Sequence, residues 1–314
     1  MTDDGRNMER GTLLASSPPS PGSRFDHVVF PQRRRRRPVD LSSVVDPGPT
    51  QRRDELRLLE HEIAFLDWIF DRATMRLEGY RRETLSRRLP ACLRALRVTT
   101  LTEARRAIEE DPSLVHRAIG ALLVGVTSFF RDPEVFTWLA NEGLVGLGRG
   151  RPGLYLWSVG CSDGAELYSL AIILAELGRL DPSYLLGTDC RPQAIEKARA
   201  GSFGGEQLED VSGPLRDRYF SSAGDRLCVV QELRDRIRWR VADVLKGSEP
   251  GLWDVVFFRN TAMYLRSEVQ HELWERMESS VRPGGLLVLG RAERPFGTRR
   301  LHPVRPCVFR RVQT

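Results

Sequence analysis

The chain has 314 residues, 41% of them hydrophobic, and a formal net charge of +6. That length allows one large domain or two smaller ones, and the apolar fraction is enough to build a core. Five cysteines without close pairing argue against a disulfide framework or a zinc site, and the longest apolar runs are too short to span a bilayer. We therefore expect a cytoplasmic protein without a secretory signal and without membrane insertion.

Residues 1–50 are rich in Pro, Ser, Gly and Arg and predict a disordered tail. Up to Arg53 there are ten Arg against six Asp plus Glu, so this segment carries much of the net charge. The run from Arg33 to Arg37 fits either a solvated basic linker or a contact with nucleic acid or acidic lipid. No aromatic residue lies among the arginines for base stacking, so we favour the linker and expect no nucleic-acid partner.

A small helical domain is predicted over residues 54–125. Apolar side chains recur at three- and four-residue steps from Asp54, as on the buried face of an amphipathic helix. A second helix is expected over residues 80–96, where Pro90 should kink or divide it.

Later helices have recognisable start signals. Thr100 and Glu103 have the spacing of a capping box, which predicts a third helix. Asp111, followed by a proline, is expected to cap a fourth helix, and Asp132 repeats that signal.

Residues 126–314 alternate between strand and helix patterns, which predicts an α/β domain with a mostly parallel sheet and helices on both faces, a Rossmann-like fold. Strands are expected over 154–159, 184–188, 237–241, 253–258 and 286–289, and helices over 165–177, 192–200 and 267–281. Residues 219–231 do not fit this alternation and predict a small inserted β-hairpin.

A glycine-containing turn follows the first predicted strand, where a ligand can approach the backbone closely. Gly160 and Gly164 flank this turn, and the absence of a GxGxxG pattern argues against a dinucleotide site. Asp189 ends the next strand, so it can accept hydrogen bonds from ribose hydroxyls or cap the helix that begins at Pro192. Glu166, in the first turn of a helix, either favours the positive helix end or binds a cationic amino group.

Polar residues also end the later strands. Asp243 can accept from an adenine amino group, or it is an ordinary residue at a strand end. Arg259 and Asn260 follow an apolar strand and point toward a crevice, with Tyr264 about one helical turn further on.

Arg131 follows two phenylalanines that anchor its backbone. Its guanidinium suits a carboxylate of a cofactor or a substrate, or it forms a salt bridge with Glu134. No cluster in these segments has metal-ligand spacing, so we expect no metal. Together the segments suggest a methyltransferase that uses S-adenosylmethionine (SAM).

The motifs resemble those of the CheR family of SAM-dependent protein-glutamate O-methyltransferases, which act on chemoreceptors, and the resemblance covers residues 54 to about 312. They are T-x-F-F-R-D from Thr127, W-S-x-G-C-S-x-G-x-E-x-Y-S from Trp157, Thr188-Asp189, Arg218-Tyr219-Phe220, R-N-x-x-x-Y from Arg259 and L-G-x-x-E ending at Glu293.

The resemblance implies SAM as cofactor and S-adenosylhomocysteine as product. The residues that would line the cofactor site, in addition to Gly160 of the glycine turn, are Thr127, Arg131, Glu166, Asp189, Asp243, Val244, Arg259 and Asn260. Arg131 and Tyr264 would flank the methyl acceptor. The acceptor is expected to be an acidic protein, a cytoplasmic helix of a chemoreceptor, and the second helix could meet it with Arg87, Arg94 and Arg97 or simply present a solvated basic face.

The chain departs from the family pattern at several positions. Gly125 replaces an asparagine, Ala165 replaces the first of two acids, Phe258 replaces a cysteine, and residues 261–263 replace an aliphatic stretch. The cofactor motifs are therefore kept while the acceptor side differs. Three functions remain open: a receptor glutamate methyltransferase, a related enzyme acting on another protein, peptide or small carboxylic acid, and a non-catalytic module that binds SAM or its product.

Overall fold

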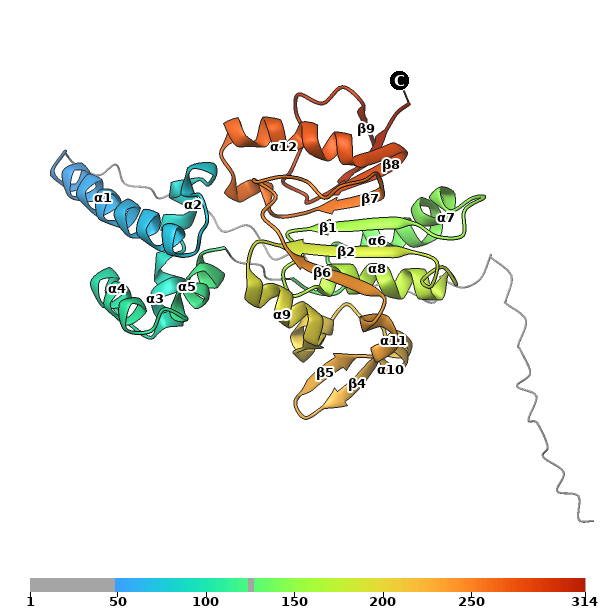
Figure 1. Cartoon of the computed structure of the whole chain (residues 1–314), viewed down its shortest axis with the longest axis horizontal. Helices are drawn as coiled ribbons and strands as arrows, with labels where there is room; N and C mark the ends of the chain where they lie inside the picture. Colours follow the sequence, from blue (N-terminus) through green and yellow to red (C-terminus); the bar gives the residue numbers. More distant parts are fainter. Residues whose placement is uncertain (1–48, 124–126, 314) are drawn as a thin grey trace, which may run out of the picture.

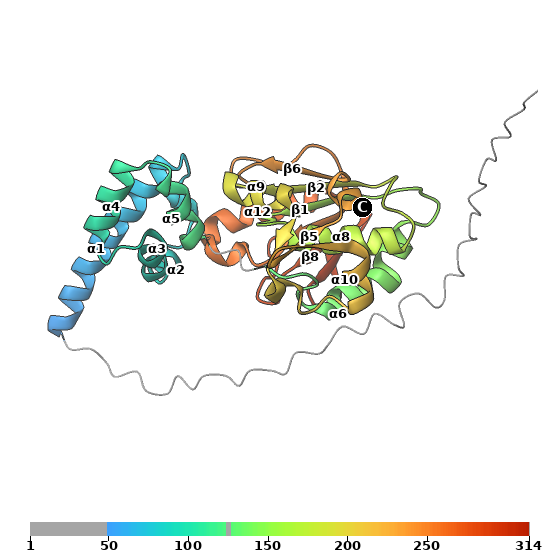
Figure 2. The same ribbon diagram turned by 90° about the horizontal axis from the view of Figure 1, so that it is seen from below.

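The computed structural model describes residues 49–123 and 127–313, with side chains from residue 60 onward. It comprises a helical part and an α/β part, which lie side by side in both views (Figures 1 and 2). The predicted disordered tail up to residue 48 and the departure at Gly125 lie outside the described residues.

The helical part consists of amphipathic helices around an apolar centre. Its helices are α1 (Pro49–Arg72), α2 (Arg82–Ser86), α3 (Leu89–Leu96), α4 (Leu101–Glu110) and α5 (Leu114–Leu122), with a 3-10 turn η1 (Leu77–Gly79) after α1. Leu66 and Ile69 of the predicted stripe are fully buried. The predicted division near Pro90 is confirmed: α2 ends at Ser86, and Pro90 occupies the first turn of α3, where its missing N–H leaves no helical hydrogen bond unmade.

The helix starts of this part follow the predicted signals in one case and depart from them in another. The capping box of Thr100 and Glu103 is confirmed, because each side chain accepts a hydrogen bond from the other residue's backbone. Asp111 was wrongly expected to cap α5. That helix begins at Leu114, and the Asp111 carboxylate instead accepts from the N–H and hydroxyl of Ser113, at 3.0 and 2.6 Å, in the turn before it.

The α/β part is built on a seven-stranded sheet in the order β6-β2-β1-β7-β8-β10-β9. Its strands are β1 (Tyr155–Val159), β2 (Tyr184–Asp189), β6 (Ile237–Val241), β7 (Trp253–Phe258), β8 (Val281–Leu289), β9 (Leu301–Arg305) and β10 (Val308–Arg311). Neighbouring strands from β6 to β8 pair in parallel, whereas β10 pairs antiparallel with both β8 and β9. The predicted fold class is therefore confirmed. The antiparallel strands at the end of the chain were not predicted.

Helices cover both faces of this sheet, as alternate residues of β7 show. Val255 and Phe257 belong to one apolar cluster, which includes buried residues of α6 (Pro133–Trp138), α8 (Ala165–Glu176) and α9 (Pro192–Ala200). Val256 and Phe258 belong to a second cluster, which includes α12 (Ser267–Ser280) and the helical part. Strand residues alternate between faces, so this one strand contributes to both cores.

A small antiparallel sheet is inserted between α9 and β6. It contains β3 (Ser202–Phe203), β5 (Arg226–Val229) and β4 (Phe220–Ala223) in that order. The predicted hairpin is present as β4 and β5, whose register runs from Phe220 opposite Val229 to Ala223 opposite Arg226. The remaining helices are a π-helical turn (Leu139–Gly143), α7 (Leu144–Leu147), η3 (Gly205–Leu208), α10 (Gly213–Tyr219), α11 (Gln231–Arg234) and η4 (Ala262–Tyr264).

Candidate active site

The site lies where the carboxyl ends of β1, β2, β6 and β7 meet. The chain runs outward from β1 through β2 to β6 and then returns to β7 on the other side of β1, which places a crevice at this edge of the sheet. A cavity of about 970 Å³, open mouth included, occupies this position. All the residues assigned to the cofactor or the acceptor from the sequence line it: Thr127, Arg131, Gly160, Glu166, Asp189, Asp243, Val244, Arg259, Asn260 and Tyr264.

The glycine turn between β1 and α8 leaves no room for side chains at its two glycines. Gly160 has φ +65°, and a Cβ there would lie 2.7 Å from the Oγ1 atom of Thr261. Gly164 has φ +90°, and a Cβ there would lie 2.6 Å from the Trp239 ring. Both positions therefore require glycine, and the turn can bring its backbone against a ligand.

Asp189, at the end of β2, is buried and fully engaged by neighbouring donors. One oxygen accepts from the backbone N–H of Ser162 at 3.0 Å and from Nη2 of Arg191 at 3.0 Å, and the other accepts from N and Nε of Arg191, each at 2.9 Å. Asp189 does not cap α9, since Arg191 occupies the N-cap position. Arg191 also donates to the carbonyl oxygen of Leu123 at 2.6 Å, which ties this carboxylate to the end of the helical part.

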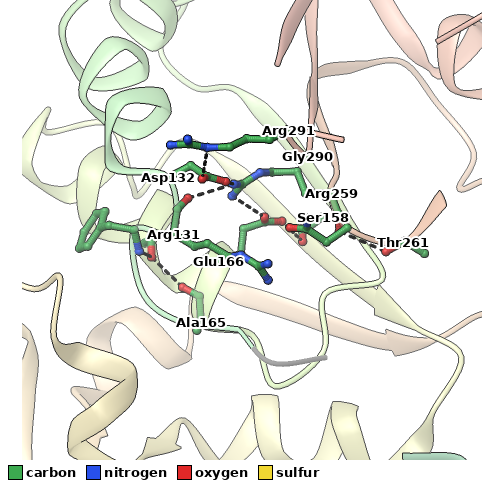
Figure 3. A network of polar contacts seen from close by, with 12 residues as sticks. Arg131, Asp132, Ser158, Ala165, Glu166, Arg259, Thr261, Gly290 and Arg291 are labelled. Atoms are coloured by element: carbon green, nitrogen blue, oxygen red, sulfur yellow. Dashed lines mark hydrogen bonds and ion pairs between the residues drawn. The ribbon is translucent and has the colours of Figure 1, made fainter. Parts of the chain in front are cut away.

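Arg259 is the centre of a buried ionic network (Figure 3). Its side chain is 2% exposed, pairs with Asp132 and with Glu166, and donates from Nη2 to the carbonyl oxygen of Arg131 at 3.0 Å. Its Nη1 lies 3.2 Å from Oε2 of Glu166, whose other oxygen accepts from the Ser158 hydroxyl at 2.9 Å. Burial raises the pKa of Glu166, and Arg259 and the Ser158 hydrogen bond oppose that rise.

Asp132 has a different role from the helix cap that was predicted. It precedes α6 with φ +62° and makes no side-chain capping hydrogen bond. Its carboxylate pairs instead with Arg259 and with Arg291, whose Nε lies 2.5 Å from it. Glu134, considered from the sequence as a partner of Arg131, pairs with Arg291. The two acids at the start of α6 therefore bind arginines from distant strand ends.

Asp243, after β6, and the segment after β7 provide further polar groups to the cavity. One oxygen of Asp243 accepts from the backbone N–H of Leu245 at 2.9 Å. Asn260 adopts a left-handed conformation with φ +57°, after which η4 carries Tyr264 to the cavity.

Several residues that line the cavity were not assigned to it from the sequence, among them the polar residues Tyr80 and Arg191. Tyr80 comes from the helical part, where backbone hydrogen bonds between residues 79–81 and 264–266 hold it against the α/β part. Burial raises its pKa, and Cys190, Asp243 and Asp189 nearby raise it further. An isolated tyrosine carries no local signal of such a position. The sequence offered one indication for Arg191, which lies two positions after Asp189, the last residue of β2.

The described residues carry no group of three or more His, Cys, Asp or Glu side chains placed to bind a metal ion. Among the described helices, none combines the length and apolar character needed to cross a bilayer.

Two protein-family models match the chain, one over the α/β part and one over the helical part. The family model described as CheR methyltransferase, SAM binding domain, matches residues 125–307, and the one described as CheR methyltransferase, all-alpha domain, matches residues 63–123. Chemotaxis protein methyltransferase 2 of Pseudomonas aeruginosa is 35% identical, over 66% of this chain and 76% of that protein. A chemotaxis protein methyltransferase of Klebsiella aerogenes is 33% identical, over 72% of this chain and 80% of that protein.

A third relative, from Pseudomonas aeruginosa and named as a probable biofilm formation methyltransferase, is 34% identical over 58% of this chain and 45% of that protein. The SAM-binding model alone covers more than half of the sequence. The chain therefore belongs to the CheR family of SAM-dependent methyltransferases, as its motifs predicted.

Proposed function

We propose that this protein transfers a methyl group from SAM to glutamate side chains of a chemoreceptor. The observation that carries the proposal is the convergence of Asp189, Asp243 and Arg131 on one cavity at the carboxyl ends of the strands, within the segment that the SAM-binding model matches.

The cavity offers a partner for each polar part of SAM. Each carboxylate oxygen of Glu166 has one partner, Arg259 or Ser158, which leaves acceptor capacity for a cationic amino group. Asp243 has capacity for an adenine amino group beyond its bond to a backbone N–H. The Oγ1 atom of Thr127 is buried without a hydrogen-bond partner among the described residues, as expected of an atom that awaits a ligand.

Asp189 sets a condition on ribose binding. A carboxylate has about four acceptor positions, and Ser162 and Arg191 together make four bonds to it. A ribose hydroxyl would therefore replace one of the Arg191 bonds. We expect the Arg191 side chain to move when the cofactor binds.

SAM supplies the methyl group on a positively charged sulfur. A glutamate side chain is already ionised near neutral pH, so the protein need not provide a strong base. Arg131 and Tyr264 orient the attacking carboxylate, and the walls of the cavity exclude water. Alignment of the acceptor, rather than proton transfer, is the main contribution of these side chains.

The proposed partner is an acidic helix of a receptor's cytoplasmic region. Arg87, Arg94 and Arg97 are exposed on and beside α2 and α3, where they can attract such a helix. The five cysteines carry free thiols, in keeping with the proposed cytoplasmic location.

Calorimetric titration with SAM and S-adenosylhomocysteine tests the cofactor site. We expect Asp189→Ala to weaken binding at least about tenfold, because it removes charge-assisted hydrogen bonds. Asp181→Ala serves as the control, since Asp181 is 77% exposed and forms a surface pair with Arg236. No binding of either ligand by folded wild-type protein would contradict the proposal and favour a module used for protein contacts.

Methylation of purified receptor cytoplasmic fragments tests the acceptor. Glutamyl methyl esters are labile to base, so radioactive methanol released by alkali identifies the product. Incorporation into base-stable sites, or none into receptors, would contradict receptor glutamates as the acceptor.

A second candidate is methylation of a different acceptor by the same site. Met263 is 45% exposed next to Tyr264, within the segment that departs from the family pattern. The replacement of an aliphatic stretch by Thr261, Ala262 and Met263 changes the shape and polarity of this segment, which could select a different surface around the target carboxylate. Methylation of a small carboxylic acid or of an unrelated protein, with receptors unmodified, would favour this candidate.

A further inference from the structure

One buried carboxylate accepts hydrogen bonds from four backbone N–H groups beside the proposed acceptor site. Glu293 is 4% exposed and follows β8. Its Oε1 accepts from the N–H groups of Thr261 and Ala262, both at 2.8 Å. Its Oε2 accepts from Asn260 at 2.9 Å and from Gly290 at 2.8 Å. The acceptor capacity of the carboxylate is therefore filled by backbone alone.

The backbone after β7 is shaped to receive this carboxylate. The left-handed conformation of Asn260 turns three successive N–H groups toward one point, an arrangement that binds anions. Gly290 lies against the same point: a Cβ there would sit 2.8 Å from Nδ2 of Asn260 and 2.9 Å from Oε2 of Glu293. Glycine at 290 thus permits the contact between the two segments.

The same turn also reaches the segment that carries Arg131. The N–H of Glu293 donates to the carbonyl oxygen of Gly290 at 3.0 Å and closes a turn over residues 290–293. Arg291, within that turn, pairs with Asp132 (Figure 3). It also pairs with Glu134. The turn therefore holds the segment after β7 through Glu293 and the start of α6 through Arg291.

We propose that residues 290–293 form a brace that sets the positions of Tyr264 and Arg131 for methyl transfer, with Glu293 and Arg291 as positioning residues. This inference rests on the proposed function. The two side chains come from segments far apart in the sequence, and alignment is the main source of rate enhancement expected here, so a shift of either segment lowers the rate. Neither positioning residue needs to touch the cofactor or the acceptor.

Glu293→Gln is the sharpest test, because it keeps the side-chain shape but points an amide NH₂ at N–H donors. We expect kcat for receptor methylation to fall about 10- to 100-fold, with a smaller change in the Kd for S-adenosylhomocysteine measured by calorimetry. Hydrogen exchange at the amides of residues 260–262 and 290 should become faster, while exchange in β1 stays unchanged. Glu275→Gln is the matched control, since Glu275 is 60% exposed on α12.

Arg291→Ala tests the contact between the brace and the start of α6. It also provides a test of the proposal if the Glu293→Gln protein does not fold. Arg291 is 62% exposed, so its loss should be tolerated by the fold. We expect a lower kcat with nearly unchanged affinity for S-adenosylhomocysteine.

Several results would overturn the inference. One is a folded Glu293→Gln protein with wild-type kcat and unchanged exchange at residues 260–262. Another is a fall in kcat fully explained by a matching loss of S-adenosylhomocysteine binding. If the wild-type protein binds S-adenosylhomocysteine but methylates no receptor, the proposed acceptor fails, and exchange at residues 260–262 still decides whether Glu293 holds the segment.

Discussion

Removal of the Arg259 side chain should strongly destabilise the α/β part. Arg259 is the positive centre between two acids, Asp132 and Glu166, and its own side chain is 2% exposed. In Arg259→Ala, Asp132 keeps Arg291 as a partner, whereas Glu166 loses its direct ion pair and keeps the Ser158 hydroxyl and the weaker attraction of Arg131. A buried charge that loses its partner typically costs about 3–5 kcal/mol. We expect a loss of about 3 kcal/mol, at the lower end of that range, because Asp132 keeps a direct ion pair and Arg131 still attracts Glu166.

Urea unfolding at pH 7, followed by tryptophan fluorescence, measures this loss in the free energy of unfolding. Arg149→Ala is the control, because Arg149 is exposed, and a surface substitution of this kind should stay within about 0.5 kcal/mol. The cost of Arg259→Ala should shrink as the pH falls, since Glu166 without its cation takes up a proton more readily.

A double-mutant cycle with Glu166→Gln isolates the pair. We expect the double variant to be more stable than the sum of the single losses predicts, by about 1–3 kcal/mol. Additive losses, or a cost below about 1 kcal/mol for Arg259→Ala alone, would refute the view that this network is held by buried charge pairing.

Three further outcomes are expected. Burial raises the pKa of Glu166 above 4.5, so its contribution to stability is fully present below that pH and is lost as the pH rises through the raised value. Urea unfolding at stepwise increasing pH should therefore show that the stability of the wild type relative to Glu166→Gln falls over that range. A rise in this relative stability would contradict the expected sign. Gly164→Ala should lower the free energy of unfolding by about 1–3 kcal/mol more than Gly178→Ala does. Both glycines have positive φ, but only Gly164 is crowded, by Trp239. Equal losses would show that backbone conformation alone matters. Burial raises the pKa of the thiols of Cys92, Cys161, Cys190 and Cys307, which lowers the fraction of reactive thiolate at each. Cys228 in the hairpin should therefore react first with iodoacetamide, and a fast phase that survives Cys228→Ser would disprove this.

The sequence alone determined the strand and helix alternation and which strand ends carry polar side chains. The predicted helix over 192–200 has the same limits as α9, and the predicted strand over 253–258 the same as β7. These patterns are local, because hydrophobic periodicity and start signals are written within a few residues. The candidate site could also be anticipated, since the carboxyl ends of parallel strands meet at one edge.

The partners of these polar groups depend on long-range packing that the sequence does not show. The sequence around Asp132 is that of a helix start, yet its carboxylate binds Arg259 and Arg291 from other strand ends. Strand β9 contains Pro303, which obscures a strand pattern but is tolerated at the edge of the sheet. Glu293 has no local feature that marks it as the acceptor for four N–H groups. Contacts between residues far apart in the chain depend on how whole elements pack, and a single sequence does not record that packing.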